Sequence, residues 1–249
     1  MKIEKYKKEY AVKSYEADRN GYLRLISLMN ILQDIASENA ELLGFGFETC
    51  HAKNLAWVGS NYLLQIERLP RIGEHFLIET WPAEGKIWGA IRNFIVKDQQ
   101  DNALIRVKSQ WVLIDIDRRR PVALSKHFPE YHFLNESVME ADFTKMPEIT
   151  QPDLQKEFSV RYDDIDINDH VNNAVYPLWA AESLSPQFRQ NHLPQEIEIS
   201  FKKEALLGET VKVITKISGA ETLHIIYDKN SGDELADCRI KWGEITSKP

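Results

Sequence analysis

The sequence has few cysteines, no long apolar run and no excess of basic residues, and each deficit excludes a class of protein. Its two cysteines, Cys50 and Cys238, match no metal-binding spacing, so we expect free thiols in a reducing compartment and no metal site. No apolar stretch approaches the roughly 18 residues that span a membrane. Residues 1–5 are charged and lack the apolar region of a signal peptide. These features predict a cytoplasmic protein without a membrane partner.

The charge balance is acidic, because 31 Lys and Arg residues face 38 Asp and Glu residues and give a net charge of −7. Such a surface repels phosphate backbones, so we expect no nucleic acid partner. The glycine fingerprints of nucleotide-binding loops are also missing, and we expect no cofactor. With 43% hydrophobic residues, the 249-residue chain can bury the core of one large domain or two small ones.

A weak internal repeat is the most informative feature of the sequence. In each half a leucine precedes a tryptophan by seven residues, and a basic residue stands three positions before the tryptophan. Three pairs of segments occur in the same order: 18–22 with 166–170, 72–74 with 207–209, and 104–111 with 235–242. We therefore predict a duplicated domain, with an N-terminal unit at 1–135, a linker at 136–152 and a C-terminal unit at 153–249.

Each half shows the pattern of one helix followed by several strands. Apolar residues recur at helical spacing over 26–43, where Gly44 can end the helix. A second helix is expected over 174–183, with Asn173 as its N-cap. Alternation of polar and apolar residues predicts the strands, at 76–81, 91–96, 106–115, 196–201 and 210–215. One helix packed on a curved antiparallel sheet, made twice, is an α+β fold.

Polar side chains with catalytic potential concentrate between 166 and 173. Asp166, Asn168 and His170 stand at alternate positions, which share one face in an extended segment. They precede a helix N-terminus, whose free amides can polarise a carbonyl, and imidazole transfers protons near neutral pH. The same residue types are also common in turns and helix caps. The first half carries Tyr22 opposite His170, which favours a single working site in the second half.

Glu204 is a second candidate, because the repeat places it opposite Leu69. A carboxylate therefore occurs only in the second half. The residue could instead continue the polar face of the strand at 196–202 and point to solvent. A turn or bulge before Gly208 would redirect it.

The chain resembles the acyl–acyl carrier protein (ACP) thioesterases over nearly its whole length. The similarity rests on 27–34, 54–58 and 106–121 in the first half, and on 166–173, Tyr176, Trp179, 182–183 and 201–204 in the second. This resemblance implies a tandem hot-dog fold, in which each helix is wrapped by an antiparallel sheet. It also implies that the first unit shapes the acyl pocket, while Asp166, Asn168, His170 and Glu204 are the catalytic residues.

The resemblance implies hydrolysis of fatty acyl-ACP to fatty acid and ACP. Plant members carry a cysteine after the glutamate, but Ala205 stands there in this chain, so water or Glu204 itself must attack. We expect His170 and Asn168 to polarise the thioester or place the water, Asp166 to orient His170, and Glu204 to act as general base. Basic clusters that could dock ACP are 118–120, 202–203, and Arg68 with Arg71.

Two other functions remain open from the sequence. A hot-dog hydratase or dehydratase also pairs a histidine with an acid, and a hot-dog module could bind acyl thioesters without cleaving them. Chain-length preference and the choice between ACP and coenzyme A are not readable from the sequence. A homodimer is also left open, although two fused units could satisfy the pairing that single units need.

Overall fold

The structure, a computed structural model, describes residues 4–85 and 89–245 of the chain. The first half consists of β1 (Tyr6–Ala11), the 3₁₀ turn η1 (Ser14–Glu16), α1 (Leu25–Leu42), α2 (Phe47–Ala52), β2 (Leu55–Ile66), β3 (His75–Ala83), β4 (Gly89–Lys97), β5 (Ala103–Asp115), β6 (Arg120–Pro121) and α3 (Leu124–His127). The second half consists of β7 (Leu154–Ser159), η2 (Tyr162–Asp164), α4 (Val175–Glu182), α5 (Pro186–Asn191), β8 (His192–Phe201), β9 (Thr210–Ser218), β10 (Glu221–Asp228) and β11 (Glu234–Glu244).

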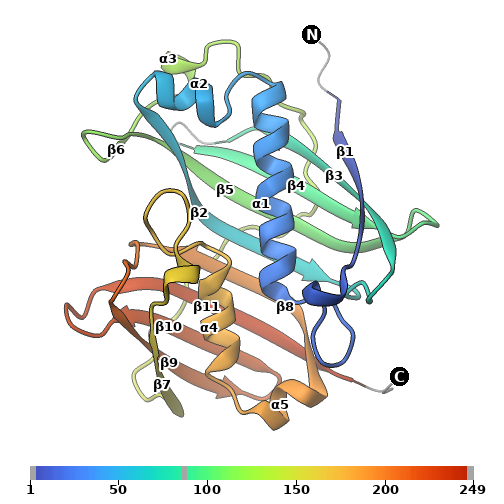
Figure 1. Cartoon of the computed structure of the whole chain (residues 1–249), viewed down its shortest axis with the longest axis vertical. Helices are drawn as coiled ribbons and strands as arrows, with labels where there is room; N and C mark the ends of the chain where they lie inside the picture. The colour runs from blue at the N-terminus through green and yellow to red at the C-terminus, as the bar shows by residue number, and fades with distance from the viewer. Residues whose placement is uncertain (1–3, 86–88, 246–249) are drawn as a thin grey trace.

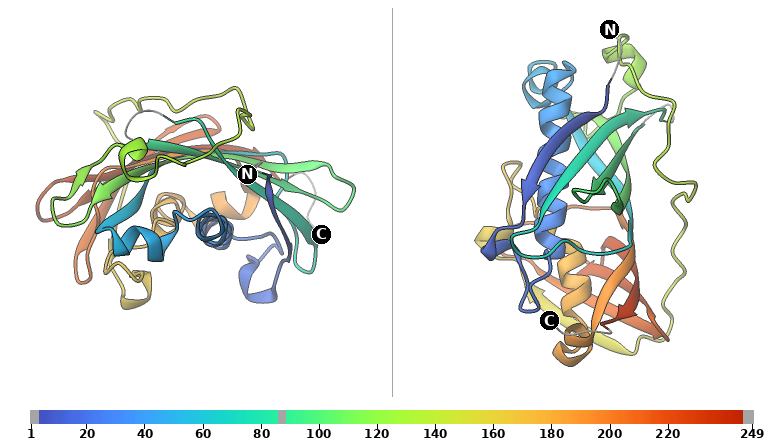
Figure 2. Two further views of the ribbon diagram at one scale, coloured as in Figure 1. Left: turned by 90° about the horizontal axis from the view of Figure 1, so that it is seen from above. Right: turned by 90° about the vertical axis from the view of Figure 1, so that its right-hand side faces the viewer.

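The strands form one continuous antiparallel sheet in the order β1-β3-β4-β5-β2-β8-β11-β10-β9-β7, with β6 attached to β5. The order in the second half mirrors the order in the first. The halves join where β2 pairs with β8, with Leu64 opposite Ile197. In Figure 2 the sheet arches over α1 and α4, which lie on its concave side. This arrangement confirms the predicted α+β fold of two helix-and-sheet units.

Helix α1 confirms the helix predicted over 26–43, and its end follows from Gly44. Gly44 has a φ of +80°, a left-handed conformation that glycine adopts without steric cost. The amides of Gly44 and Phe45 then bond back to the carbonyls of Glu41 and Ala40 at 3.0 and 3.1 Å. These bonds satisfy carbonyls that a helix end leaves free. The inner side of α1 is fully buried against the sheet (Figure 1), through Leu28, Met29, Leu32 and Ile35.

The predicted cap of the second helix is wrong, because α4 begins after Ala174 and no side chain caps it. Asn172, not Asn173, accepts a hydrogen bond from the amide of Ala174, at 2.9 Å from its Oδ1. Asn172 Oδ1 also accepts from Gln33 Nε2 at 3.1 Å, which ties the start of α4 to α1. The Asn173 side chain is therefore free of the capping role.

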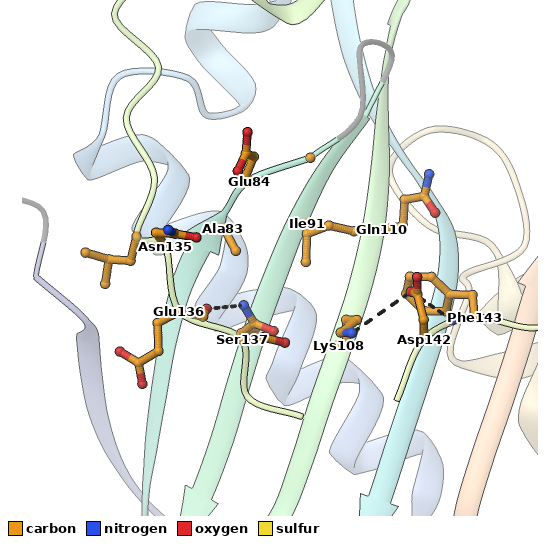
Figure 3. A pocket seen from close by; sticks show the side chains of 13 residues that line it. Ala83, Glu84, Ile91, Lys108, Gln110, Asn135, Glu136, Ser137, Asp142 and Phe143 are labelled. Carbon is orange, nitrogen blue, oxygen red and sulfur yellow. Dashed lines mark hydrogen bonds and ion pairs between the residues drawn. The ribbon is translucent and has the colours of Figure 1, made fainter. Parts of the chain in front are cut away.

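The segment predicted as a linker lies along the convex face of the sheet, opposite the helices (Figure 2). We call residues 134–153 the strap. Trp81 Nε1 donates to the carbonyl of Glu136 at 2.9 Å, and the Thr144 amide donates to the carboxylate of Glu198. A cavity of about 300 Å³ remains between the strap and β4–β5, with Lys108 facing Asp142 (Figure 3). The predicted unit boundaries at 135 and 153 stay a prediction.

Among the described residues, no helix combines the length and apolar character required to cross a membrane.

Candidate active site

Residues 166–170 form a tight turn, so the predicted extended segment is wrong. The amide of Asp166 donates to the carbonyl of His170 at 2.8 Å, and the amide of Asp169 donates to the carbonyl of Asp166 at 3.1 Å. Asp166 Oδ1 accepts from the amide of Asn168 at 2.8 Å. This side-chain bond to the backbone two residues ahead favours a turn over a strand. Asp169 sits in the left-handed region, with a φ of +62°.

The first half builds the same turn from 18–22. The amide of Asp18 donates to the carbonyl of Tyr22 at 2.7 Å, and Asp18 Oδ1 accepts from the amide of Asn20 at 2.8 Å. Gly21, with a φ of +79°, occupies the place of Asp169. In the structure, Tyr22 therefore occupies the position equivalent to His170, as the sequence repeat predicts.

Glu204 lies beyond the end of β8 and not on its polar face. The amides of Lys202 and Lys203 both donate to the carbonyl of Leu235, at 2.8 and 3.2 Å. Two successive residues opposite one carbonyl form a bulge-like distortion, which redirects the chain. In the first half, the amides of Glu67 and Arg68 donate to the carbonyl of Leu104 in the same way, so Leu69 occupies the position equivalent to Glu204.

A backbone hydrogen bond brings the two candidate segments together. The amide of Val171 donates to the carbonyl of Ala205 at 3.0 Å, so the residues before each of them, His170 and Glu204, become neighbours. His170 Nε2 lies 3.4 Å from Glu204 Oε2. Their side chains are 29% and 36% exposed, so both remain accessible to water and substrate.

Arg119, from the turn between β5 and β6, forms an ion pair with the same oxygen, Glu204 Oε2. Sequence reasoning missed this contact, because 85 residues separate the two side chains. The only signal was the basic cluster at 118–120.

His170, Glu204, Asp166 and Asn168 all line one cavity of about 960 Å³. The cavity extends from the junction of the two halves into the first half, between the sheet and helices α1 and α2. Its walls there are mostly apolar or small, and include Ala36, Ala40, Phe45, Leu55, Trp57, Gly59, Ala90 and Trp111. Concave apolar sites with a few polar groups are typical of small-molecule binding.

Gly59 allows the close approach of Asn173 to the sheet in this cavity. A Cβ at Gly59 would lie 3.0 Å from Asn173 Nδ2 and 3.6 Å from the ring of Trp111. Asn173 also lines the cavity, so its amide is a polar group that the predicted site set did not include.

Asp166 does not contact the His170 side chain in the way that the sequence hypothesis requires. Asp166 Oδ1 accepts a hydrogen bond from the amide of Asn168. The hydrogen bond between Asp166 and His170 joins only their backbone atoms. Asp166 therefore sets the position of His170 by shaping the turn that carries it.

Neither cysteine is placed as a nucleophile. Cys238 is fully buried in β11, and burial raises the pKa of its thiol. Cys50 lines the cavity, but burial raises the pKa of its thiol to about 11, so it stays protonated at neutral pH. At the position after Glu204, the buried amide of Ala205 donates to the hydroxyl of Tyr176 at 2.9 Å.

Within 4–85 and 89–245 there is also no group of three or more His, Cys, Asp or Glu side chains suited to a metal ion.

Known proteins share both the sequence pattern and the fold. The chain is 26% identical to oleoyl-acyl carrier protein thioesterase 2 of Arabidopsis thaliana, over 98% of this chain and 78% of that protein. Its fold matches the 12:0-ACP thioesterase of Umbellularia californica with a TM-score of 0.86 and 22% identity, over 96% and 97% of the two chains. An acyl-ACP thioesterase of Bacteroides thetaiotaomicron also gives 0.86 and 22%, over 96% and 98%.

Family models account for most of the sequence. Residues 3–131 match the acyl-ACP thioesterase N-terminal domain, and residues 148–244 match the acyl-ACP thioesterase C-terminal domain. These matches confirm the predicted resemblance and the prediction of a thioester-hydrolysing enzyme. The chain belongs to the acyl-ACP thioesterase family.

Proposed function

We propose that this chain hydrolyses fatty acyl-ACP with Glu204 as the general base and His170 as its partner. The observation that carries the proposal is the Glu204–His170 pair at the wall of a largely apolar cavity. Both contacts to Glu204, from His170 and Arg119, use Oε2. Oε1 can therefore accept a proton from water. The water oxygen adds to the thioester carbonyl, and the C–S bond then breaks. Glu204 gives the proton that it took from water to the sulfur, so ACP leaves as the free thiol and the chain leaves as the free acid.

The remaining residues act on the substrate carbonyl and on the turn that carries His170. Asn168 and Asn173 line the cavity and bear amide donors for the oxyanion that forms when water adds. The start of α4 lies beside them and favours negative charge there. Asp166 is a positioning residue, because its carboxylate accepts from the Asn168 amide and stabilises the turn.

The general-base role predicts that Glu204→Gln releases thiol from acyl-ACP about 10² to 10⁴ times more slowly than the unmodified enzyme. The amide keeps the shape of the side chain but cannot take up the proton. The measurement is free thiol and free acid after incubation with ACP charged with a fatty acid. Glu157→Gln is the matched control, because Glu157 lies on β7 and pairs with Lys229 at 2.7 Å, away from the cavity.

Near-normal turnover in Glu204→Gln would contradict the general-base role. The same assay separates the rival functions. A binding module would retain acyl-ACP without releasing thiol, and a dehydratase would change the acyl chain while the thioester stays intact.

For the acidic carrier protein, the basic cluster 118–120 is the best docking candidate. It is exposed on the turn next to the cavity, and Arg119 itself lines the cavity. In the other two clusters, three of the four side chains are paired with carboxylates of the chain. Lys202 contacts Asp237 at 2.6 Å, Lys203 contacts Asp233 at 2.8 Å, and Arg68 contacts Glu74 at 2.7 Å.

Replacing Arg118 and Arg120 by Gln should lower kcat/KM for acyl-ACP about tenfold at low salt, because steering by opposite charge raises the association rate. High salt should remove most of the difference. A short uncharged acyl thioester serves as the second substrate and should be unaffected. The control is the double replacement of Arg68 and Arg71 by Gln. Equal loss with both substrates would refute the docking surface.

We place the enzyme in the cytoplasm, without nucleic acid or membrane partners. A homodimer would have to form outside the β2–β8 joint, which already pairs the two halves within the chain. Light scattering at several protein concentrations distinguishes a monomer from a homodimer.

A further inference from the structure

Arg92 places a buried positive charge in the wall of the acyl cavity. It lies on β4, is 6% exposed, and lines the same cavity as His170 and Glu204. Its Nη1 donates to Asn39 Oδ1 at 2.7 Å and to Thr80 Oγ1 at 3.3 Å, and both partners are neutral. Burial lowers the pKa of the Arg92 guanidinium to about 10, so it remains charged at neutral pH.

The guanidinium has more donors than these partners use. Arginine carries five N–H groups, and both hydrogen bonds that Arg92 makes to side chains in the described part of the chain leave from Nη1. No carboxylate among those residues pairs with it. A buried charge without a counter-ion is costly, and its unused donors favour an oxygen acceptor.

The surroundings of Arg92 are suited to a chain-like ligand with one polar point. Tyr131 lines the cavity as well, and burial raises the pKa of its hydroxyl to about 12, so it stays a neutral donor. The neighbouring wall is apolar, and is formed by Ala36, Ala40, Phe45 and Ala90. A plain alkyl chain passing Arg92 would displace water from the guanidinium without replacing its hydrogen bonds.

Arg92 is remote from the thioester. Three strand spacings separate β4 from β8, after which Glu204 follows, in the order β4-β5-β2-β8. At about 4.8 Å per spacing, Arg92 lies about 14 Å across the sheet from the strand that leads to Glu204. A group that contacts Arg92 therefore belongs to the far part of an acyl chain and not to the carbons next to the carbonyl.

We infer that Arg92 and Tyr131 form a polar subsite that binds an oxygen, such as a hydroxyl or oxo group, on the far part of the acyl chain. The inference rests on the proposed function only in taking the cavity as the acyl site. The substrate class is acyl chains that carry an oxygen near their end. The enzyme prefers these chains over plain chains that are long enough to reach Arg92.

Calorimetry with uncleavable amide-linked acyl pantetheines tests the subsite without depending on hydrolysis. Three ligands of equal chain length are compared: plain, hydroxylated at the terminal carbon, and hydroxylated at the third carbon. The terminal hydroxyl should tighten binding about tenfold or more in at least one chain length, as expected for a hydrogen bond to a charged group. The hydroxyl at the third carbon should give no gain.

Arg92→Met should reduce the tenfold preference to about one, and Tyr131→Phe should reduce it in part. Arg106→Met is the matched control, because Arg106 pairs with Glu67 at 3.3 Å outside the cavity and should keep the full preference. If Arg92→Met does not fold, Tyr131→Phe carries the test. Equal binding of plain and terminally hydroxylated ligands at every chain length overturns the subsite. Failure to release thiol from any acyl-ACP would instead overturn the proposed function.

Discussion

At the scale of single residues, His224 is a titratable group that the fold holds far from its ordinary behaviour. It lies in β10, is 1% exposed, and is surrounded by hydroxyl groups. Its Nδ1 lies 2.9 Å from Thr215 Oγ1, and its Nε2 lies 2.8 Å from Thr222 Oγ1. Burial lowers the pKa of the His224 imidazole to about 3, so the folded protein holds it neutral. The unfolded chain binds a proton near its ordinary pKa of about 6.5.

This difference predicts that the protein loses stability in acid. Above about pH 6.5 the histidine is neutral in both states and its contribution is complete. Between there and about pH 3 the unfolded state binds more protons, so the free energy of unfolding falls by up to about 1.4 kcal/mol per pH unit. Urea unfolding at pH 7.5, 6 and 5 measures the slope. His224→Gln should flatten it, while the exposed control His132→Gln should not; equal slopes in both variants would refute the assignment.

At the scale of elements, the spacing of apolar residues predicted the helix and the strands that depend on local sequence. Helix α1 and the main strands occur where apolar spacing placed them, because burial of one face decides both. The equivalence of Leu69 and Glu204, which the sequence repeat predicted, is also seen in the backbone bonds to Leu104 and Leu235.

The site itself depends on contacts that no local pattern contains. The turn at 166–170 is the local exception, because the Asp166 carboxylate accepts from the Asn168 amide, an arrangement that the same residue types allow. The pairing of His170 with Glu204 requires the Val171–Ala205 backbone bond, and the Arg119 contact requires the two halves to meet. Such long-range geometry follows from tertiary structure, so sequence reasoning could name the groups but not arrange them.

At the scale of the whole molecule, the two halves share one core. A single cluster of buried side chains includes Leu32 and Ile35 of α1 together with Trp179 and Ala180 of α4. The sheet also continues across the joint, where Leu64 and Ile197 are almost fully buried. Units that share a core and a sheet should unfold together and not as two separate domains.

Proteolytic cleavage of the strap tests whether the two halves unfold together. Residues 147–148 and 150–153 are exposed, whereas Glu198, which anchors the Thr144 amide and the Arg239 guanidinium, is 2% exposed. With a specific protease site in place of 147–151, the nicked chain should elute as one species and unfold in a single urea transition by fluorescence and circular dichroism. Adding Glu198→Gln should lower the transition midpoint, because Arg239 loses its buried charge partner. Separation of the fragments in native buffer, or two transitions, would show that the strap holds together halves that fold independently.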